Sequence, residues 1–274
     1  MRYVAVGVFA LSCAFRVPGL AAFEGAVAAP VHCALAGSSL AMRGGLMAGT
    51  QNPSGLQGMD GPCAAAWISP GIFGIEGLNG AGCAVGLPYA GIPVALHVTS
   101  LGLHGYHEVT ASLAAARRIN GSAELGLRLN CDILSIRGYG SAAVPTLDAG
   151  CHIDVGSGCD LAFLCTNILA ARIGPAGESL PVRLAAGCAY HPTSGEFVVY
   201  ATCARELLSS PEWSAGIEYA PVPSFILRAG CSSEPALLCA GCAVVASGLK
   251  LEYAVVHHAQ LGETHSIALS VGFD

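Results

Sequence analysis

The last ten residues, HSIALSVGFD, alternate strictly between apolar and small or polar side chains. Ile267, Leu269, Val271 and Phe273 fall on one parity, and only serine, alanine and glycine stand between them. A period of two is typical of a β-strand with one apolar and one polar face. The pattern therefore predicts a strand, and it leaves open whether the apolar face meets a protein core or lipid.

The same alternation recurs in AELGLRLNCDI, LDAGCHIDV, EWSAGIEYA and LKLEYAV. Each segment has about ten residues, the length that a tilted strand needs to cross a bilayer. Roughly fourteen such segments follow residue 64, and tight turns such as INGS and HPTSG alternate with longer connections such as SIRGYGSAAVP, NILAARIGPAGESLP and HHAQLGE. We therefore expect an all-β transmembrane antiparallel barrel of about fourteen strands.

The amino-acid composition indicates whether the apolar strand faces contact lipid or a protein core. Charged residues make up 11% of the chain and hydrophobic residues 53%, whereas a soluble domain carries about a quarter charged residues. The 36 glycines and 15 prolines disfavour long helices, so an apolar chain of this kind favours a barrel. A soluble β-sandwich or propeller remains the alternative, because alternation alone fits both. The net charge of −6 disfavours nucleic-acid binding.

Three segments follow from these patterns. Residues 1–21 resemble a signal peptide, with Arg2, a short apolar run and a small residue at Ala21, although lipid attachment at Cys13 is a weaker alternative. Residues 22–62 do not alternate and are rich in small residues and turns, which favours a partly helical hatch, because about fourteen strands leave a hole. Residues 63–274 form the barrel. The export signal and the barrel together predict the outer membrane of a diderm bacterium, with membrane lipid and the barrel-assembly machinery as partners.

Neither the cysteines nor the histidines indicate a redox or metal site. Most of the 13 cysteines share the parity of neighbouring Leu, Ile and Val residues, so we interpret them as small apolar side chains rather than as disulfide, redox or metal sites. No catalytic motif is present. We predict no enzyme activity, no cofactor and no metal.

Parity places most ionisable strand residues on the polar face, toward the lumen. Mixed signs predict ion-pair networks that solvate the interior and hold the hatch, and the functional alternative is a carboxylate head-group site at Arg128, Arg183 or Arg228. The predicted lumen-facing residues are Glu124, Arg128, Asp132, His152, Asp154, Arg183, Arg228, Lys250 and Glu252, with Asp148 and Glu218 on the same parity.

The segment AGSSLAMRGGLMAGTQNPSGL resembles the N-terminal signature of FadL-like outer-membrane proteins and of their PorV-type relatives. The closing segments AGIEYAPVPSFILRAG and LEYAVVHHAQLGETHSIALSVGFD are similar to the last hairpins of the PorV-type group. The resemblance implies a fourteen-stranded barrel with an N-terminal hatch. It assigns Asn52, Pro53, Gly55 and Leu56 to the hatch, and Ser54 stands where the family usually has alanine.

Three functions remain open at this stage. The FadL branch implies passive uptake of long-chain fatty acids or other hydrophobic solutes. The PorV branch implies a secretion or assembly partner whose outer loops dock exported proteins. The third possibility is a structural surface barrel without a transport role.

Overall fold

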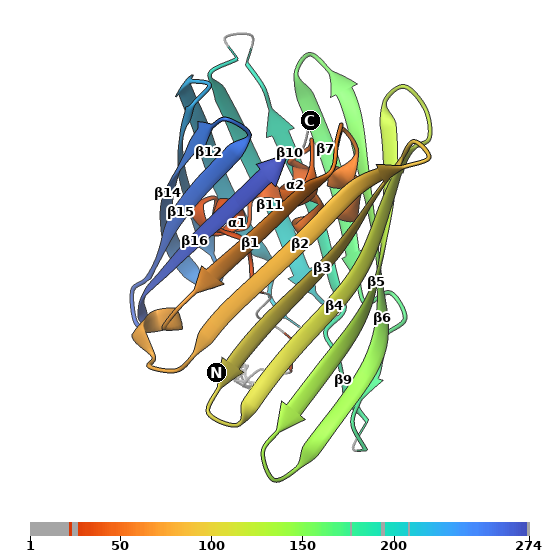
Figure 1. The fold of residues 1–274 in the computed structure, drawn as a ribbon, viewed down its shortest axis with the longest axis vertical. Coiled ribbons are helices and arrows are strands. Elements are labelled where there is room, and N and C mark those ends of the chain that lie inside the picture. The colour runs from red at the N-terminus through yellow and green to blue at the C-terminus, as the bar shows by residue number, and fades with distance from the viewer. Residues whose placement is uncertain (1–21, 24–26, 176, 193–194, 208, 273–274) are drawn as a thin grey trace, which may run out of the picture.

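A computed structural model describes residues 22–23, 27–175, 177–192, 195–207 and 209–272. Its main element is a closed antiparallel barrel, as Figure 1 shows. Going round the wall, neighbouring strands are also neighbours in sequence, except that β7 pairs with β10 and β1 closes the ring against β16. The predicted all-β barrel of about fourteen strands is confirmed. The signal-peptide and lipid-attachment predictions for residues 1–21 lie outside the described residues.

The barrel strands are β1 (Cys63–Ser69), β2 (Asn79–Tyr89), β3 (Ile92–Leu103), β4 (Tyr106–Arg118), β5 (Ala123–Ile136), β6 (Gly140–Gly156), β7 (Cys159–Thr166), β10 (Arg183–Tyr190), β11 (Phe197–Glu206), β12 (Glu212–Val222), β13 (Phe225–Ser233), β14 (Ala236–Ala246), β15 (Leu249–His258) and β16 (Gly262–Gly272). A separate small hairpin joins β8 (Arg172–Ile173) and β9 (Glu178–Ser179). The helical elements are α1 (Pro30–Ala34), α2 (Leu46–Gln51) and the 3₁₀ turns η1 (Ser39–Ala41), η2 (Pro53–Leu56) and η3 (Ile72–Gly74).

The two rims of the barrel differ in their connections. The turn rim carries the start of β1, the end of β16 and short links such as 90–91, 157–158 and 247–248. The loop rim, at the lower end of the barrel in Figure 1, carries the long links 70–78 and 167–182. Two other links that the sequence predicted to be long are mostly strand, because β5, β6, β15 and β16 continue into them. Long hairpins therefore replace loops on this rim.

Alternate residues of each strand point to opposite sides of the wall, as the parity argument predicts. On β5, Leu125, Leu127 and Leu129 are 49%, 56% and 54% exposed, whereas Glu124 and Arg128 are 2% and 8% exposed. Large apolar side chains thus cover the outside of a closed barrel, and polar ones are buried within it. The sandwich and propeller alternatives are wrong, because the ring closes on itself and turns its apolar faces outward.

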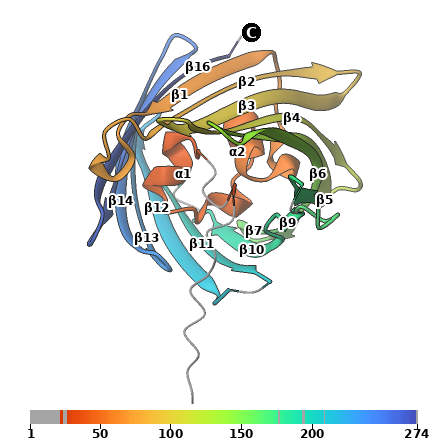
Figure 2. The ribbon, with the colours of Figure 1, turned by 90° about the horizontal axis from the view of Figure 1, so that it is seen from below.

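The hatch lies inside the ring, as the view from below in Figure 2 shows for α1 and α2. Helix α1 packs on β13–β16, and η2 packs on β3–β6. Leu35, Leu40 and Leu56 are at most 1% exposed, and each fully buried leucine contributes about 1.5–3 kcal/mol. Within the described residues, no helix has the length and apolar character needed to cross a membrane.

Candidate functional site

Two glycines on neighbouring strands form the first contact surface for the hatch. Gly126 on β5 and Gly150 on β6 are direct cross-strand partners. A Cβ at Gly126 would lie 2.2 Å from the amide nitrogen of Ser54, and one at Gly150 would lie 2.0 Å from Oδ1 of Asn52. No side chain fits there, so the missing Cβ atoms allow the hatch backbone to touch the wall. We call this pair the glycine seat.

A second pair of cross-strand glycines receives the other end of the hatch. Gly216 on β12 faces Gly230 on β13. A Cβ at Gly230 would lie 2.5 Å from the carbonyl carbon of Leu35, and one at Gly216 would lie 2.5 Å from Oγ of Ser38. The hatch thus sits in close backbone contact with two separate parts of the wall.

These wall glycines were not among the residues that the sequence singled out, although a signal exists. The tripeptide Ala-Gly-Cys recurs on β2, β6, β10, β13 and β14. The glycines concerned are Gly82, Gly150, Gly187, Gly230 and Gly241. A Cβ at each of them would lie within 3.0 Å of an atom of Trp67 or of a hatch residue, and at Gly230 these atoms belong to the Leu35 backbone. The flanking alanine and cysteine point outward, so the motif marks wall positions where the lumen side has no room.

The residues that the family resemblance assigns to the hatch lie at its seated end. Asn52 is fully buried, its Oδ1 accepts from the Ser54 amide and hydroxyl at 3.2 and 2.8 Å, and its Nδ2 donates to the Leu40 carbonyl at 3.3 Å. Pro53 starts η2, and a Cβ at Gly55 would approach the Met42 carbonyl oxygen to 3.0 Å. Asn52 therefore caps the turn that rests on the glycine seat.

His32 ties the helical pieces of the hatch together. Its Nδ1 lies 2.8 Å from Oγ of Ser39, and its Nε2 lies 2.8 Å from the Met47 carbonyl and 3.0 Å from Oγ1 of Thr50. Burial lowers the pKa of His32 to about 4. Its ring is therefore neutral at physiological pH, and it joins α1, η1 and α2 through hydrogen bonds.

An ionic cluster, which we call the Arg43 clamp, fixes the middle of the hatch near the turn rim. Arg43 lies 2.6 Å from Glu124 and 3.0 Å from Asp160. Arg118 also pairs with Glu124, at 2.9 Å. Glu124 is 2% exposed, and its Oε2 has no hydrogen-bond partner among the described residues. The clamp thus joins one hatch residue to three strands of the wall.

Histidines border the clamp on the Asp160 side. Nε2 of His191 lies 3.3 Å from one carboxylate oxygen of Asp160, and Nε2 of His152 lies 3.9 Å from the other. His152 is 1% exposed, and neither ring nitrogen has a hydrogen-bond partner among the described residues. Despite this grouping, no set of three or more His, Cys, Asp or Glu side chains in the described part of the chain could hold a metal ion.

Two more polar networks lie on the lumen face. Arg128 pairs with Asp148 at 2.8 Å and donates to the Thr50 carbonyl of the hatch at 2.7 Å. Asp132 extends this network by accepting from Thr110 and Thr146, at 2.7 Å each. Arg128 is therefore satisfied by the wall and the hatch together.

Across the lumen, Arg228 pairs with Glu218 at 2.6 Å and with Glu252 at 2.8 Å, and Lys250 pairs with Glu252 at 3.0 Å. Arg228 is 5% and Glu252 is 1% exposed. A buried charge group of this kind needs every partner, because an unpaired member would be strongly destabilising.

Two predicted lumen residues lie apart from these networks. Asp154 is exposed at the β6–β7 turn, where it accepts from the Gly156 amide at 2.8 Å. Arg183 pairs with Glu212 at 2.7 Å near the loop rim, and both side chains are partly exposed. The structure thus brings the other predicted lumen residues toward the hatch and leaves these two outside that group.

A cavity of 910 Å³, which we call the vestibule, opens between the hatch and the wall at the turn rim. Three of the chain's 4 methionines, Met42, Met47 and Met59, line its hatch side. Arg118 and Lys250 line its wall side together with the buried Arg228. Asp160 and Glu218 also line it, so the vestibule places a flexible apolar surface opposite a wall of paired cations and acids.

The sequence matches no protein-family model and no curated protein. Solved structures nevertheless share the fold. The CymD monoaromatic hydrocarbon channel aligns with a TM-score of 0.70 at 11% identity, covering 90% of this chain and 97% of that one. The Ralstonia pickettii toluene transporter TbuX gives 0.67 at 10% identity, with 90% and 98% covered.

A Pseudomonas aeruginosa FadL homologue gives a TM-score of 0.61 at 9% identity, again covering 90% of this chain and 98% of that one. The chain has the fold of FadL-type channels. The alignments cover almost the whole of each solved chain, so the likeness extends over the entire barrel.

Proposed function

We propose that this chain is an outer-membrane channel for passive uptake of hydrophobic solutes, in which residues 22–62 act as the hatch of the barrel formed by 63–274. The observation that carries the proposal is a barrel of FadL-type fold whose lumen holds a closely seated segment. A segment packed on two glycine pairs blocks free diffusion, so solutes would pass only when it shifts. The fold's solved examples include channels for monoaromatic hydrocarbons and toluene.

The vestibule supports an amphiphilic acid as the solute, with long-chain fatty acids as the natural class. Methionine side chains adapt to irregular apolar chains, and Arg118 and Lys250 can attract a carboxylate. Of the three arginines that the sequence named as anion partners, Arg228 lines the vestibule but is already paired with two acids. Arg118 and Lys250 each pair with a single acid and are more exposed than Arg228, so they are the better candidates for the head group.

The proposal places the protein in the outer membrane of a diderm bacterium, inserted by the barrel-assembly machinery. The apolar outer wall would contact lipid, and the turn rim, where β1 begins and β16 ends, would face the periplasm, as short turns do in such barrels. Entry from the loop rim and exit through the vestibule then gives solutes a direction without an energy source.

Uptake by whole cells tests the proposal. Diderm cells that express the chain should take up radiolabelled oleate or toluene several-fold faster than cells with an empty vector. Cells that express a barrel without residues 30–59 should also admit small sugars, which the intact protein excludes. Equal uptake of both hydrophobic solutes with and without the chain, at matched amounts of folded barrel in the membrane, would overturn the proposal.

A further inference from the structure

Two rows of outward-facing residues cross the wall where β7 and β10 are short, with 8 residues each against 14 in β5 and 17 in β6. The cross-strand register connects the first row, which consists of Ala149, Cys165, Leu184 and Arg205. It likewise connects the second row, which consists of Cys151, Phe163, Ala186 and Cys203. The rows therefore form one continuous patch on the lipid-facing surface.

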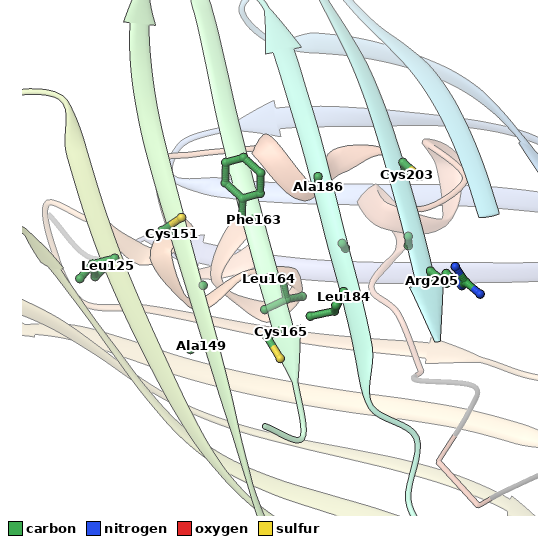
Figure 3. Close-up of a pocket in the computed structure, with 13 residues that line it drawn as sticks. Leu125, Ala149, Cys151, Phe163, Leu164, Cys165, Leu184, Ala186, Cys203 and Arg205 are labelled. Carbon is green, nitrogen blue, oxygen red and sulfur yellow. The ribbon is translucent and has the colours of Figure 1, made fainter. Parts of the chain in front are cut away.

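This patch is hollow. Its alanine and cysteine side chains leave a groove of 510 Å³ on the outside of the wall, bordered by the larger Leu125, Phe163 and Leu184. Figure 3 shows Leu125 at one side of the groove and Arg205 at the other, with the guanidinium turned away from the β11 strand. The groove is apolar along its length and ends at a positive charge.

Arg205 has no acid partner among the described residues. It is exposed, and its Nε donates to the Ser209 carbonyl at 3.1 Å. It lies one residue before the end of β11, at the loop rim. Trp213, the cross-strand partner of Cys203, is 61% exposed beside it. Exposed tryptophans mark the membrane–water boundary of a barrel, so Arg205 stands at the depth of lipid head groups.

We propose that this groove binds a phosphate-bearing membrane lipid, with the phosphate at the Arg205 guanidinium and an acyl chain along the small residues of the two rows. Charge complementarity selects this occupant. The Arg205 guanidinium has no acid partner among the described residues, and at head-group depth a phosphate would pair with its free N–H groups through charge-assisted hydrogen bonds. The site lies on the outer wall, so it is independent of any solute that passes through the lumen.

The reactivity of the cysteines that line the groove measures whether a lipid occupies it. The purified barrel in detergent is treated with N-ethylmaleimide, and labelling at Cys165 and Cys203 is followed by peptide mass spectrometry. Exposed Cys231 on β13 serves as the internal control. Dioctanoyl phosphatidic acid is compared with dioctanoylglycerol, which has the same acyl chains and no phosphate. Half-maximal protection should require about tenfold less phosphatidic acid than diacylglycerol, because only the former offers the ionic partner.

Variants separate head-group recognition from apolar coverage. Arg205→Ala should remove the difference between the two lipids, while Arg117→Ala, which changes an exposed residue at the turn-rim end of β4, should leave it intact. The proposal would be overturned by equal protection from both lipids, by an unchanged lipid preference in Arg205→Ala, or by equal protection of Cys231. Arg205→Lys keeps the positive charge and should retain part of the preference for the phosphate lipid. This variant tests the proposal even if Arg205→Ala fails to fold.

Discussion

The glycine seat and the Arg43 clamp hold the same hatch by different physical means. At the seat, Gly126 and Gly150 bring the backbone of β5 and β6 against Asn52 and Ser54 without any charge. At the clamp, Arg43 keeps a side chain that is 29% exposed while it pairs with buried Glu124. A dry backbone contact depends on the fit of the two surfaces, whereas a partly solvated ion pair is weakened by salt. The hatch is therefore fixed by packing at the glycine seat and held in its middle by an ionic contact that salt can loosen.

The largest effect is expected from a variant that tests whether one face of β5 contacts lipid. Leu127→Arg places a charge on the lipid side of β5, directly beside the seat residue Gly126, and should cost about 2–4 kcal/mol of barrel stability near the bilayer midplane. The free energy of unfolding in lipid vesicles measures this cost. The control is Tyr139→Arg, which changes an exposed residue in the β5–β6 turn. A similar loss in both variants would contradict the lipid-facing assignment.

Acid should loosen the hatch through His32. Its folded pKa of about 4 lies below the ordinary histidine value of 6.5, so the unfolded or released segment binds more protons between these values. The stabilisation is fully present above pH 6.5, falls as the pH drops toward 4 and amounts to about 3 kcal/mol. Hydrogen exchange of residues 30–56 at pH 7 and 4.5 measures the change.

His32→Gln keeps a hydrogen-bonding side chain that does not titrate in this range. Its hatch should show a much smaller difference in exchange between the two pH values. An equally large difference would show that His32 is not the cause.

Gly126→Val should break the seat itself. Its Cβ would lie 2.2 Å from the Ser54 amide nitrogen, and overpacking of this kind costs about 1–3 kcal/mol. We expect higher conductance in planar bilayers and faster proteolysis of residues 46–56. Gly121→Val is the matched control, because a Cβ there meets no atom within 4 Å. Unchanged conductance and proteolysis in Gly126→Val would show that the seat does not hold the hatch.

The smallest effect is expected at the clamp. Arg43→Ala should weaken hatch docking by about 1 kcal/mol, because the pair is partly solvated and Arg118 still neutralises Glu124. Proteolysis of the hatch at low and high salt measures it. Wild-type protein should become more sensitive as salt rises, and the variant should respond less. Arg137→Ala, in an exposed turn, controls for the loss of an arginine; an identical salt response in all three proteins would argue against an ionic clamp.

The contrast between seat and clamp also shows which parts of the molecule were predictable. Parity along β5 identified Glu124 and Arg128 as lumen residues, because alternation is local and needs no knowledge of neighbouring strands. Gly126 has the same parity but carries no side chain, so the sequence alone indicates only a residue that weakens the strand. The role of Gly126 depends on its pairing with Gly150 and on the contact of both glycines with the Asn52–Ser54 turn. These residues are far apart in the sequence.

Period-two alternation and scarce charge in the sequence favoured an antiparallel barrel with an apolar outside, because a closed barrel satisfies its backbone hydrogen bonds within a bilayer. The sequence also predicted that residues 22–62 form a segment separate from the wall. The folded structure was needed to locate the resting place of that segment, the charges that it meets and the outer groove that ends at Arg205. Contacts of this kind depend on strand register and on closure of the ring, which bring together residues that no local pattern connects.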